Sequence, residues 1–265
     1  MTEPLRAFWW NKAPNFGDAL SRDVIELVSG RPVTWAPEQT AQVFAVGSIM
    51  WNARKGVVKR AEGQAPPVIW GSGCMEAMDG DWCHAARVVA LRGPVTAAVL
   101  NHTPLPFGDP GLLARRLVGP VEQEDKVGVL LHHSQVTEEA LAHLRQGGDR
   151  IKIIDVRTND AKAVIREIAS CRQIFSQSLH GIIIADAYGI PNVRIEGADI
   201  HRSAQFKFYD YATSIGRAPL LSVKLQEVPE LAGQPIHPDS QAPDLPRIDA
   251  MAQGLIEAFP QDLKA

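Results

Sequence analysis

Short runs of apolar residues recur along the chain, and small or polar residues follow each of them. Runs that are apolar without alternation are typical of strands that are buried on both faces of a parallel sheet. We predict six such strands, at residues 42–46, 67–70, 87–91, 127–131, 151–156 and 173–176. The pair Trp9-Trp10 is interpreted as part of an early core strand, with contact to a membrane interface as the alternative.

Helical patterns separate several of these strands, and their ends carry recognisable capping residues. Helices are predicted at 16–29 with Gly30 as the stop, 94–100 beginning at Pro94, 138–145 capped by Thr137, 160–170 capped by Asn159, 179–188 and 248–259. The helix at 179–188 is apolar on nearly all sides, so we expect it to be buried. Alternation of strands and helices predicts an α/β fold with a parallel sheet.

One polar and acidic segment, residues 118–126, begins with Gly119-Pro120 and is typical of a linker. We therefore expect two Rossmann-like domains, at residues 1–120 and 121–265. The stretch 228–246 is rich in Pro and Gln and is expected to form a long surface connection. The last helix is expected to pack back onto one of the two domains.

Composition narrows the class of protein. The 265 residues are 45% hydrophobic and 22% charged, as in a folded globular protein, and the net charge of -3 argues against nucleic-acid binding. The three cysteines Cys74, Cys83 and Cys171 match neither a disulfide framework nor a zinc pattern, so we expect no metal site and a reducing compartment. We see neither a signal peptide nor a run of about 18 apolar residues, which favours a cytoplasmic location.

Polar motifs follow the predicted strands, where ligands bind in open α/β sheets. They are Gly47-Ser48, Gly71-Ser72-Gly73, Arg92, His132-His133 and residues 176–180. One Gly-Ser pair alone is an ordinary tight turn. Several such motifs together favour a binding cleft.

The segment 176–181 joins a predicted strand to the buried helix. Free backbone N–H groups at the start of a helix form a ready anion site. Ser176 and Ser178 add hydroxyl donors, and His180 can donate a hydrogen bond or a proton. The alternative is that the serines cap the helix and His180 is a core histidine with its hydrogen bonds made.

Residues 15–18 open the first predicted helix. Asp18 can act as a base or orient a hydroxyl group, or it can cap the helix or pair with Arg22. Asn15 and Gly17 allow the backbone to approach a ligand closely.

Two cations and one further carboxylate are candidates as well. Arg92 is suited to a carboxylate or a phosphate, with a structural salt bridge as the alternative. Lys207 lies among aromatic residues and can reach an anion or remain in solvent. Asp109 is interpreted as a helix cap.

Taken together, these motifs resemble the polysaccharide pyruvyltransferases, especially those of bacterial exopolysaccharide synthesis. The resemblance spans about residues 9–217. Its motifs are residues 15–20, Gly47-Ser48, 70–73, 91–94, 108–110, 178–181, 185–191, 207–211 and 214–216.

The resemblance implies two Rossmann-like domains facing a cleft, as in GT-B glycosyltransferases. It implies phosphoenolpyruvate as the donor, a sugar of a lipid-linked or cell-wall glycan as the acceptor, and a cyclic pyruvate ketal as the product. No metal or other cofactor is implied, and weak association with the inner membrane through the acceptor is expected.

Roles for single residues follow from the resemblance and from the chemistry. This chain has Ser178 where many relatives have Arg, so Arg92 or Lys207 is expected to carry more of the donor binding, together with Ser176 and Gly181.

His180 is the candidate acid or phosphate contact, and His132, His133 and Asp18 are candidates for activating the sugar hydroxyl. Asn15, Gly17, Gly47, Ser48, Gly71, Ser72 and Gly73 are expected to line the substrate cleft.

Two other functions remain open on the same architecture, because one fold hosts many functions. One is a glycosyltransferase that uses a nucleotide sugar. The other is a glycan-binding subunit without catalytic activity.

Overall fold

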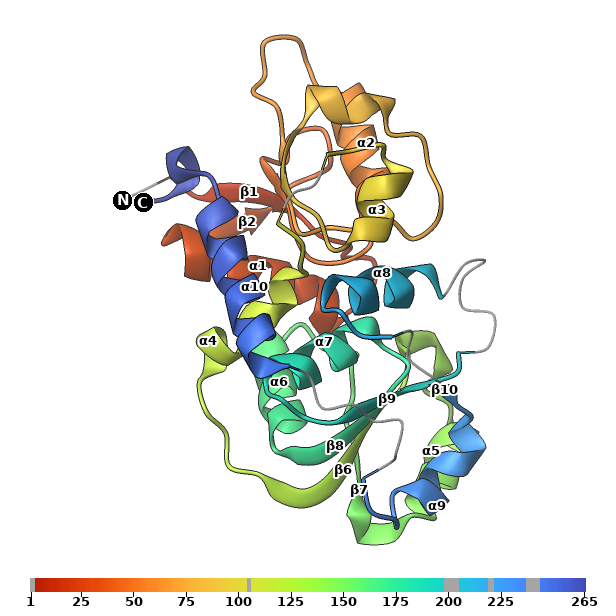
Figure 1. The fold of residues 1–265 in the computed structure, drawn as a ribbon. Coiled ribbons are helices and arrows are strands. Elements are labelled where there is room, and N and C mark those ends of the chain that lie inside the picture. The colour runs from red at the N-terminus through yellow and green to blue at the C-terminus, as the bar shows by residue number, and fades with distance from the viewer. Residues whose placement is uncertain (1–2, 104–105, 198–204, 219–221, 237–243) are drawn as a thin grey trace.

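Two five-stranded parallel sheets form the framework of the protein (Figure 1). The computed structural model describes residues 3–103, 106–197, 205–218, 222–236 and 244–265. The first sheet has the order β2-β1-β3-β4-β5. Its strands are β1 (Leu5–Phe8), β2 (Val33–Trp35), β3 (Val43–Phe44), β4 (Val68–Trp70) and β5 (Arg87–Ala90).

The second sheet has the order β10-β9-β8-β6-β7. Its strands are β6 (Glu124–Leu130), β7 (Ile151–Ile153), β8 (Cys171–Ser176), β9 (Asn192–Ile195) and β10 (Ser222–Val223). Strand β6 begins at Glu124, inside the segment expected to be a linker, so the prediction of a linker up to residue 126 was wrong at its end. The α/β class and the parallel sheets are confirmed.

Helices cover both sheets. They are α1 (Phe16–Ser29), α2 (Met50–Val58), α3 (Pro94–Val99), α4 (Ala114–Val118), α5 (Glu138–Arg145), α6 (Ala161–Ala169), α7 (Leu179–Ala187), α8 (Phe206–Ser214), α9 (Val228–Leu231) and α10 (Leu245–Ala258). The described residues also form short 3-10 helices: η1 (Asp81–Ala85), η2 (Pro110–Leu113), η3 (His133–Gln135), η4 (Gly148–Arg150), η5 (Leu225–Glu227) and η6 (Gln261–Leu263).

The local capping signals were largely correct. Gly30 ends α1 in the left-handed conformation, Pro94 is the first residue of α3, and the Thr137 side chain caps α5. Helix α6 is capped by Asp160 rather than by Asn159, because the Asp160 side chain accepts from Ala163 N–H. Helix α7 is buried along nearly its whole length, as its apolar composition predicted.

Other predictions need correction. Strand β1 ends at Phe8, so Trp9 and Trp10 are not part of the strand. Both side chains are half-buried. The stretch 228–246 contains α9 and the start of α10, and residues 237–243 lie outside the described residues.

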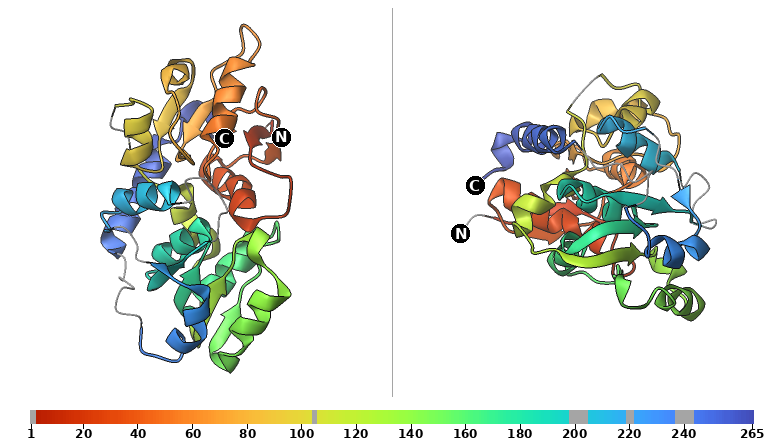
Figure 2. Two further views of the ribbon diagram at one scale, coloured as in Figure 1. Left: turned by 90° about the vertical axis from the view of Figure 1, so that its right-hand side faces the viewer. Right: turned by 60° about the horizontal axis from the view of Figure 1, so that its bottom comes forward.

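One hydrophobic cluster of the described residues spans both sheets, and two further clusters lie one in each half of the chain. The cluster that spans both sheets joins Leu5, Phe16 and Leu20 from the first half of the chain with Ile165 and Ile183 from the second. Helix α1 packs against α6, and α7 packs against η2, which precedes the second sheet in sequence. Figure 2 shows the residues coloured red to yellow mostly in one lobe and the green and cyan residues in the other.

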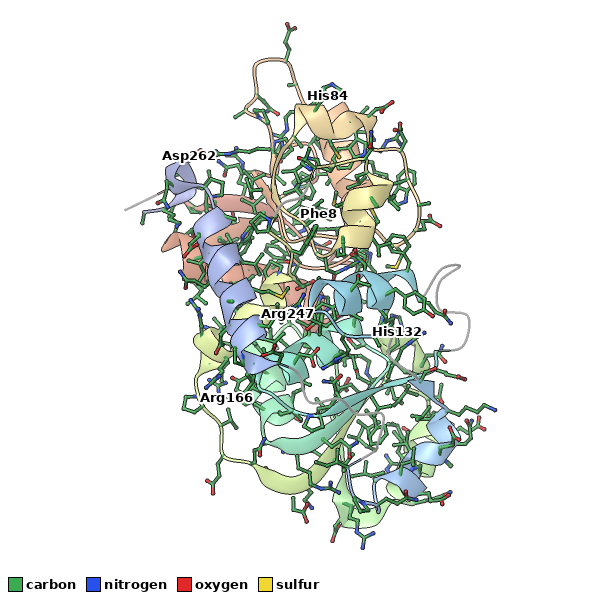
Figure 3. All side chains as sticks on the ribbon, viewed as in Figure 1. Phe8, His84, His132, Arg166, Arg247 and Asp262 are labelled. Carbon is green, nitrogen blue, oxygen red and sulfur yellow. The ribbon has the colours of Figure 1, made fainter. Side chains whose placement is uncertain are left out.

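The last helix returns to the first sheet. Trp70 Nε1 donates to the Leu255 carbonyl at 2.7 Å, and the Trp70 and Phe259 rings meet edge to face. Asp262, labelled in Figure 3 beyond the end of α10, pairs with Arg87 of β5. Helix α10 also packs against α7 and η2. It therefore contacts elements on both sides of the proposed division at residues 120 and 121.

Among the described residues, no helix is both long enough and apolar enough to cross a bilayer.

Candidate active site

Each sheet has one point at which its strand order reverses. The chain passes from β1 to β2 on one side and then to β3 on the other, and it does the same from β6 to β7 and then to β8. Loops leave such neighbouring strands in opposite directions and open a crevice at the carboxyl ends, where α/β proteins bind ligands.

The two crevices meet in one pocket of about 330 Å³. Its lining comes from the loops after β1, β3, β6 and β8, from the starts of α1, α2, α7 and α8, and from Met75. The residues are Trp10, Asn15, Asp18, Gly47, Ser48, Ile49, Asn52, Met75, His132, His133, Ser178, Leu179, His180 and Lys207. Nine of the candidates from the sequence are in this set: Asn15, Asp18, Gly47, Ser48, His132, His133, Ser178, His180 and Lys207.

The start of α1 is built to bring two side chains together. The Asn15 side chain caps the helix by accepting from Gly17 N–H at 3.0 Å. Asp18 is therefore not the cap, and Arg22 pairs with Asp23 instead. A Cβ atom on Gly17 would overlap the His180 ring. Glycine is required there by this close approach of α1 to α7.

His180 lies against a buried carboxylate. Its Nε2 is 4.0 Å from Asp109 Oδ2, and the side chains of His180 and Asp109 are 13% and 0% exposed. Neither atom has a hydrogen-bond partner among the described residues. Burial, followed by the nearby charges of Lys207 and Arg92, lowers the pKa of His180 to about 3.

Asp109 caps η2, as the sequence indicated, because its Oδ1 accepts from Gly111 N–H at 2.8 Å. Burial raises the pKa of this carboxyl to about 6.

Asp18 and Lys207 form a second pair of shifted groups. Burial raises the pKa of Asp18 to about 7, and the Lys207 charge opposes the shift. Burial lowers the pKa of Lys207 to about 8, and Arg92 adds to that shift. At neutral pH the pocket therefore holds a carboxyl that is partly protonated, an ammonium group and a neutral imidazole.

His133 carries further unpaired polar atoms into the pocket. Both of its ring nitrogens are buried and have no hydrogen-bond partner among the described residues. Burial lowers the pKa of His133, and Lys207 contributes to the shift. Its ring packs edge to face on Trp10, with 5.8 Å between the centroids. Buried polar groups are usually hydrogen-bonded, so these atoms mark a place for a polar ligand or water.

Arg92 does not reach the pocket, which corrects its expected role in donor binding. It is fully buried, and its Nε donates to Asp210 Oδ2 at 2.9 Å. Its terminal nitrogens donate to Ser48 Oγ and the Cys74 carbonyl, both at 2.6 Å. The structural salt bridge considered from the sequence is thus present. Through Asp210 and Ser48, Arg92 fixes the start of α8, which carries Lys207, and one wall of the pocket.

Ser176 and Gly181, expected to bind the donor, are also structural. Ser176 Oγ donates to the Ser178 carbonyl at 2.8 Å and accepts from Ser178 N–H at 3.0 Å. A Cβ atom on Gly181 would overlap this hydroxyl, so the glycine lets α7 pack on β8. Ser178, two residues after Ser176, does line the pocket.

Residues 71–73 lie behind the pocket rather than in it, so their expected place in the cleft was wrong. Gly71 has a φ of +81° and packs on Pro110. Ser72 is fully buried and donates to the Ala45 carbonyl at 2.5 Å. A Cβ atom on Gly73 would overlap the Arg92 guanidinium. These residues make room for Arg92.

The sequence reasoning missed five lining residues: Trp10, Ile49, Asn52, Met75 and Leu179. Most of them lie within a few residues of a motif that was noted. Ile49 and Asn52, for example, follow Gly47-Ser48 where α2 begins. A helix start after that turn was the signal that could have identified them.

Within the described residues, no group of three or more His, Cys, Asp or Glu side chains is arranged to hold a metal ion. The absence of a metal requirement remains a prediction from the sequence.

Comparison with known proteins gives partial similarities. No family model matches the chain. Over 139 residues the chain is 27% identical to the uncharacterized protein L143 of Acanthamoeba polyphaga mimivirus, covering 51% of this chain and 48% of that protein. Over 133 residues it is 31% identical to the succinoglycan biosynthesis protein ExoV of Rhizobium meliloti (strain 1021), covering 48% of this chain and 40% of that protein.

The matches thus span less than half of the length of these curated relatives. A solved structure of a functionally uncharacterized protein from Klebsiella pneumoniae aligns with 83% of this chain and 92% of its own at 12% identity. Its TM-score of 0.45 is too low to support a conclusion about fold or function.

Proposed function

We propose that this protein is a polysaccharide pyruvyltransferase, which moves the pyruvyl group of phosphoenolpyruvate onto a sugar. The observation that carries the proposal is the set of Asp18, His180 and Lys207 in one pocket at the switch points of both sheets. The partial similarity to a protein named for succinoglycan biosynthesis supports it. We further propose that the two sheets belong to Rossmann-like domains in a GT-B-like arrangement.

Lys207 and the start of α7 are the proposed donor site. Phosphoenolpyruvate carries a carboxylate and a phosphate, which need a cation and N–H donors. The Lys207 ammonium lines the pocket, as does Ser178, the N-cap residue of α7, whose side chain makes no capping hydrogen bond. The free N–H groups of α7 add partial positive charge. An anion next to Lys207 would raise its pKa again and keep it protonated.

The pKa shifts favour a division of roles that differs from the expectation from sequence. Asp18, with a pKa of about 7, is a suitable acid, because much of it is protonated at neutral pH. His180 is neutral because its pKa is lowered to about 3 in the unliganded protein, and the negative charges of bound phosphoenolpyruvate would raise that pKa toward the range of a working base. We accordingly propose Asp18 as the acid and His180 as the base, the reverse of the roles inferred from the sequence.

The proposed reaction has an addition step followed by a displacement step. Asp18 protonates the methylene carbon of the donor, and a sugar hydroxyl attacks the neighbouring carbon while His180 takes its proton. A second hydroxyl of the same sugar then displaces phosphate and closes the ketal ring, and its proton leaves with the phosphate. His132 and His133 border the same pocket and are candidates for activating that second hydroxyl.

The acceptor side is proposed to be the wall that holds Trp10 and Asn52, which are uncharged, in contrast to the cationic Lys207 of the proposed donor site. We propose that the sugar belongs to an exopolysaccharide precursor that is lipid-linked. On that basis the reaction would take place in the cytoplasm at the inner membrane.

The first test is thermal unfolding with phosphoenolpyruvate, and in parallel with UDP and UDP-sugars. A ligand at about 100 times its dissociation constant stabilises the native state by roughly 2.7 kcal/mol. We expect a shift with phosphoenolpyruvate that Lys207→Met reduces and that the matched control Lys162→Met, at an exposed position of α6, leaves unchanged.

A shift with UDP alone would instead favour a glycosyltransferase. If phosphoenolpyruvate binds but no glycan acceptor ever releases phosphate from it, the catalytic part of the proposal fails and a binding subunit remains.

A further inference from the structure

The carboxylate of Asp109 lies at the point where the two halves of the fold meet. Asp109 precedes η2, and η2 packs against α1, α7 and α10. Asp109 thereby reaches His180 on α7 from the first half of the chain. It does not line the pocket, so it cannot act on a ligand directly.

Every polar atom of this pair has a defined place. Asp109 Oδ1 accepts from Gly111 N–H, the backbone N–H of Gly47 also acts on the carboxyl, and Oδ2 faces His180. The His180 ring is held between Asp109 on its Nε2 side and Gly17 on its Nδ1 side. Oδ2 and Nε2 are both buried, and each lacks another partner among the described residues.

We propose that Asp109 is a positioning residue for His180. Its Oδ2 accepts the Nε2–H of the imidazole and so holds the ring in the tautomer that leaves the Nδ1 lone pair, on the Gly17 side of the ring, free to accept a proton. The catalytic consequence rests on the proposed function, because that tautomer is the one able to take a proton from a hydroxyl at Nδ1. The pairing itself does not depend on the reaction.

The present distance of 4.0 Å must shorten by about 1 Å to become a hydrogen bond. Hydrogen bonds of catalytic groups are often long before ligand binds and tighten in the complex. A carboxylate that fixes a histidine tautomer is a recurrent way of preparing a base.

Asp109→Asn gives a sharp test, because Gly111 N–H determines which way the new amide must face. Its oxygen is required at the Oδ1 position, so its NH₂ group occupies the Oδ2 position and donates to Nε2. The variant therefore forces the proton onto Nδ1. Nitrogen-15 chemical shifts distinguish the two tautomers, and the signal of His180 is the one of eight histidines that His180→Gln removes.

We expect the Nε2–H tautomer in the wild type and the Nδ1–H tautomer in Asp109→Asn. Turnover should fall by about 10² or more, the range of a positioned acid–base group, while the dissociation constant for phosphoenolpyruvate stays unchanged. Asp109→Ser keeps an N-cap for η2 and removes Oδ2, so it separates the two roles of Asp109. It should unfold like the wild type but lose the preference for one tautomer.

The outcomes are distinguishable. An Nδ1–H tautomer in the wild type, or the same tautomer in all three proteins, would overturn the proposal and leave Asp109 as a cap alone. Absence of turnover in the wild type with all glycan acceptors tested would count against the proposed function. The tautomer measurement would still show whether Asp109 pairs with His180.

Discussion

Helix α7 carries two buried polar clusters, and they differ in how completely they are paired. Around Asp186 every atom of the carboxylate is used: Oδ1 accepts from Arg217 and Asn192, both at 2.6 Å, and Oδ2 accepts from Tyr211 at 2.9 Å. Around His180, six residues earlier on the same helix, the buried atoms His180 Nε2 and Asp109 Oδ2 have no partner among the described residues.

The difference distinguishes polar residues with a structural role from polar residues available for function on the same helix. Buried polar groups left unpaired reduce stability, so unpaired groups beside a pocket mark a place where a ligand or a reaction can use them. The Asp186 network is complete, and it ties α7 to β9 and α8. The His180 cluster is incomplete and faces the pocket. Residue type alone does not make this distinction, since both clusters contain an Asp and a basic partner.

The largest expected effect comes from breaking the complete cluster. Asp186→Ala leaves the Arg217 guanidinium, which is 5% exposed, without its carboxylate. Removing one partner of a buried ion pair typically lowers the free energy of unfolding by about 3–5 kcal/mol. Urea denaturation measures this loss. A normal unfolding curve with weakened ligand binding would mean that Asp186 belongs to the site after all.

The incomplete cluster should show the opposite pattern. His180→Ala should lower turnover by about 10² to 10⁴, as expected for loss of an acid–base group. Its free energy of unfolding should fall by less than that of Asp186→Ala, because the buried Nε2 has no hydrogen-bond partner among the described residues and only packing is lost.

Phosphate release and urea denaturation are the two measurements for this variant. His84→Ala, at an exposed position of η1, is the control and should change neither quantity. Full turnover in His180→Ala would remove the histidine from the mechanism.

The lowered pKa of Lys207 predicts that ligand binding depends on pH. With a pKa of about 8, Lys207 loses its charge as pH rises above 8, so affinity for phosphoenolpyruvate should fall up to tenfold per pH unit there. Lys207→Arg keeps the charge and should remove this fall. Calorimetric titration from pH 7 to 9.5 measures it.

The stability of the free protein should move the other way. Between about pH 8 and 10.5 the unfolded chain binds more protons at Lys207 than the folded chain does, because the folded pKa is the lower one. The Lys207 contribution to stability therefore improves with rising pH in this window. A decrease that Lys207→Met abolishes would contradict the assigned burial.

The smallest effect is expected at the surface. The ion pair of Arg87 with Asp262 has a distance of 2.7 Å, but its side chains are 48% and 64% exposed. Asp262→Ala should change the free energy of unfolding by about 1 kcal/mol or less. The same change in charge thus has a large effect at Asp186 and a small one here, because only the buried pair loses its solvation.

Much of the fold was predictable from the sequence because its determinants are local. The apolar runs gave β3 to β8, and the caps gave α1, α3 and α5. Strand β10 has two residues, and β2 has one buried residue out of three, so neither carries a pattern that a sequence could reveal. They exist because β9 and β1 offer them a paired edge.

The pocket was predictable in its outline for a similar reason. Polar residues after buried parallel strands must gather at the carboxyl ends of the sheet, and nine of the candidates do so. The sequence could not show which polar residues line the pocket and which ones only support its wall from behind. Arg92 is bound by Asp210, which is 118 residues away, and His180 faces Asp109 from the other half of the chain. Hydrophobic patterning and capping act between neighbours in the sequence. The pairing of buried charges acts between residues that are close only in space, so it becomes visible once the chain is folded.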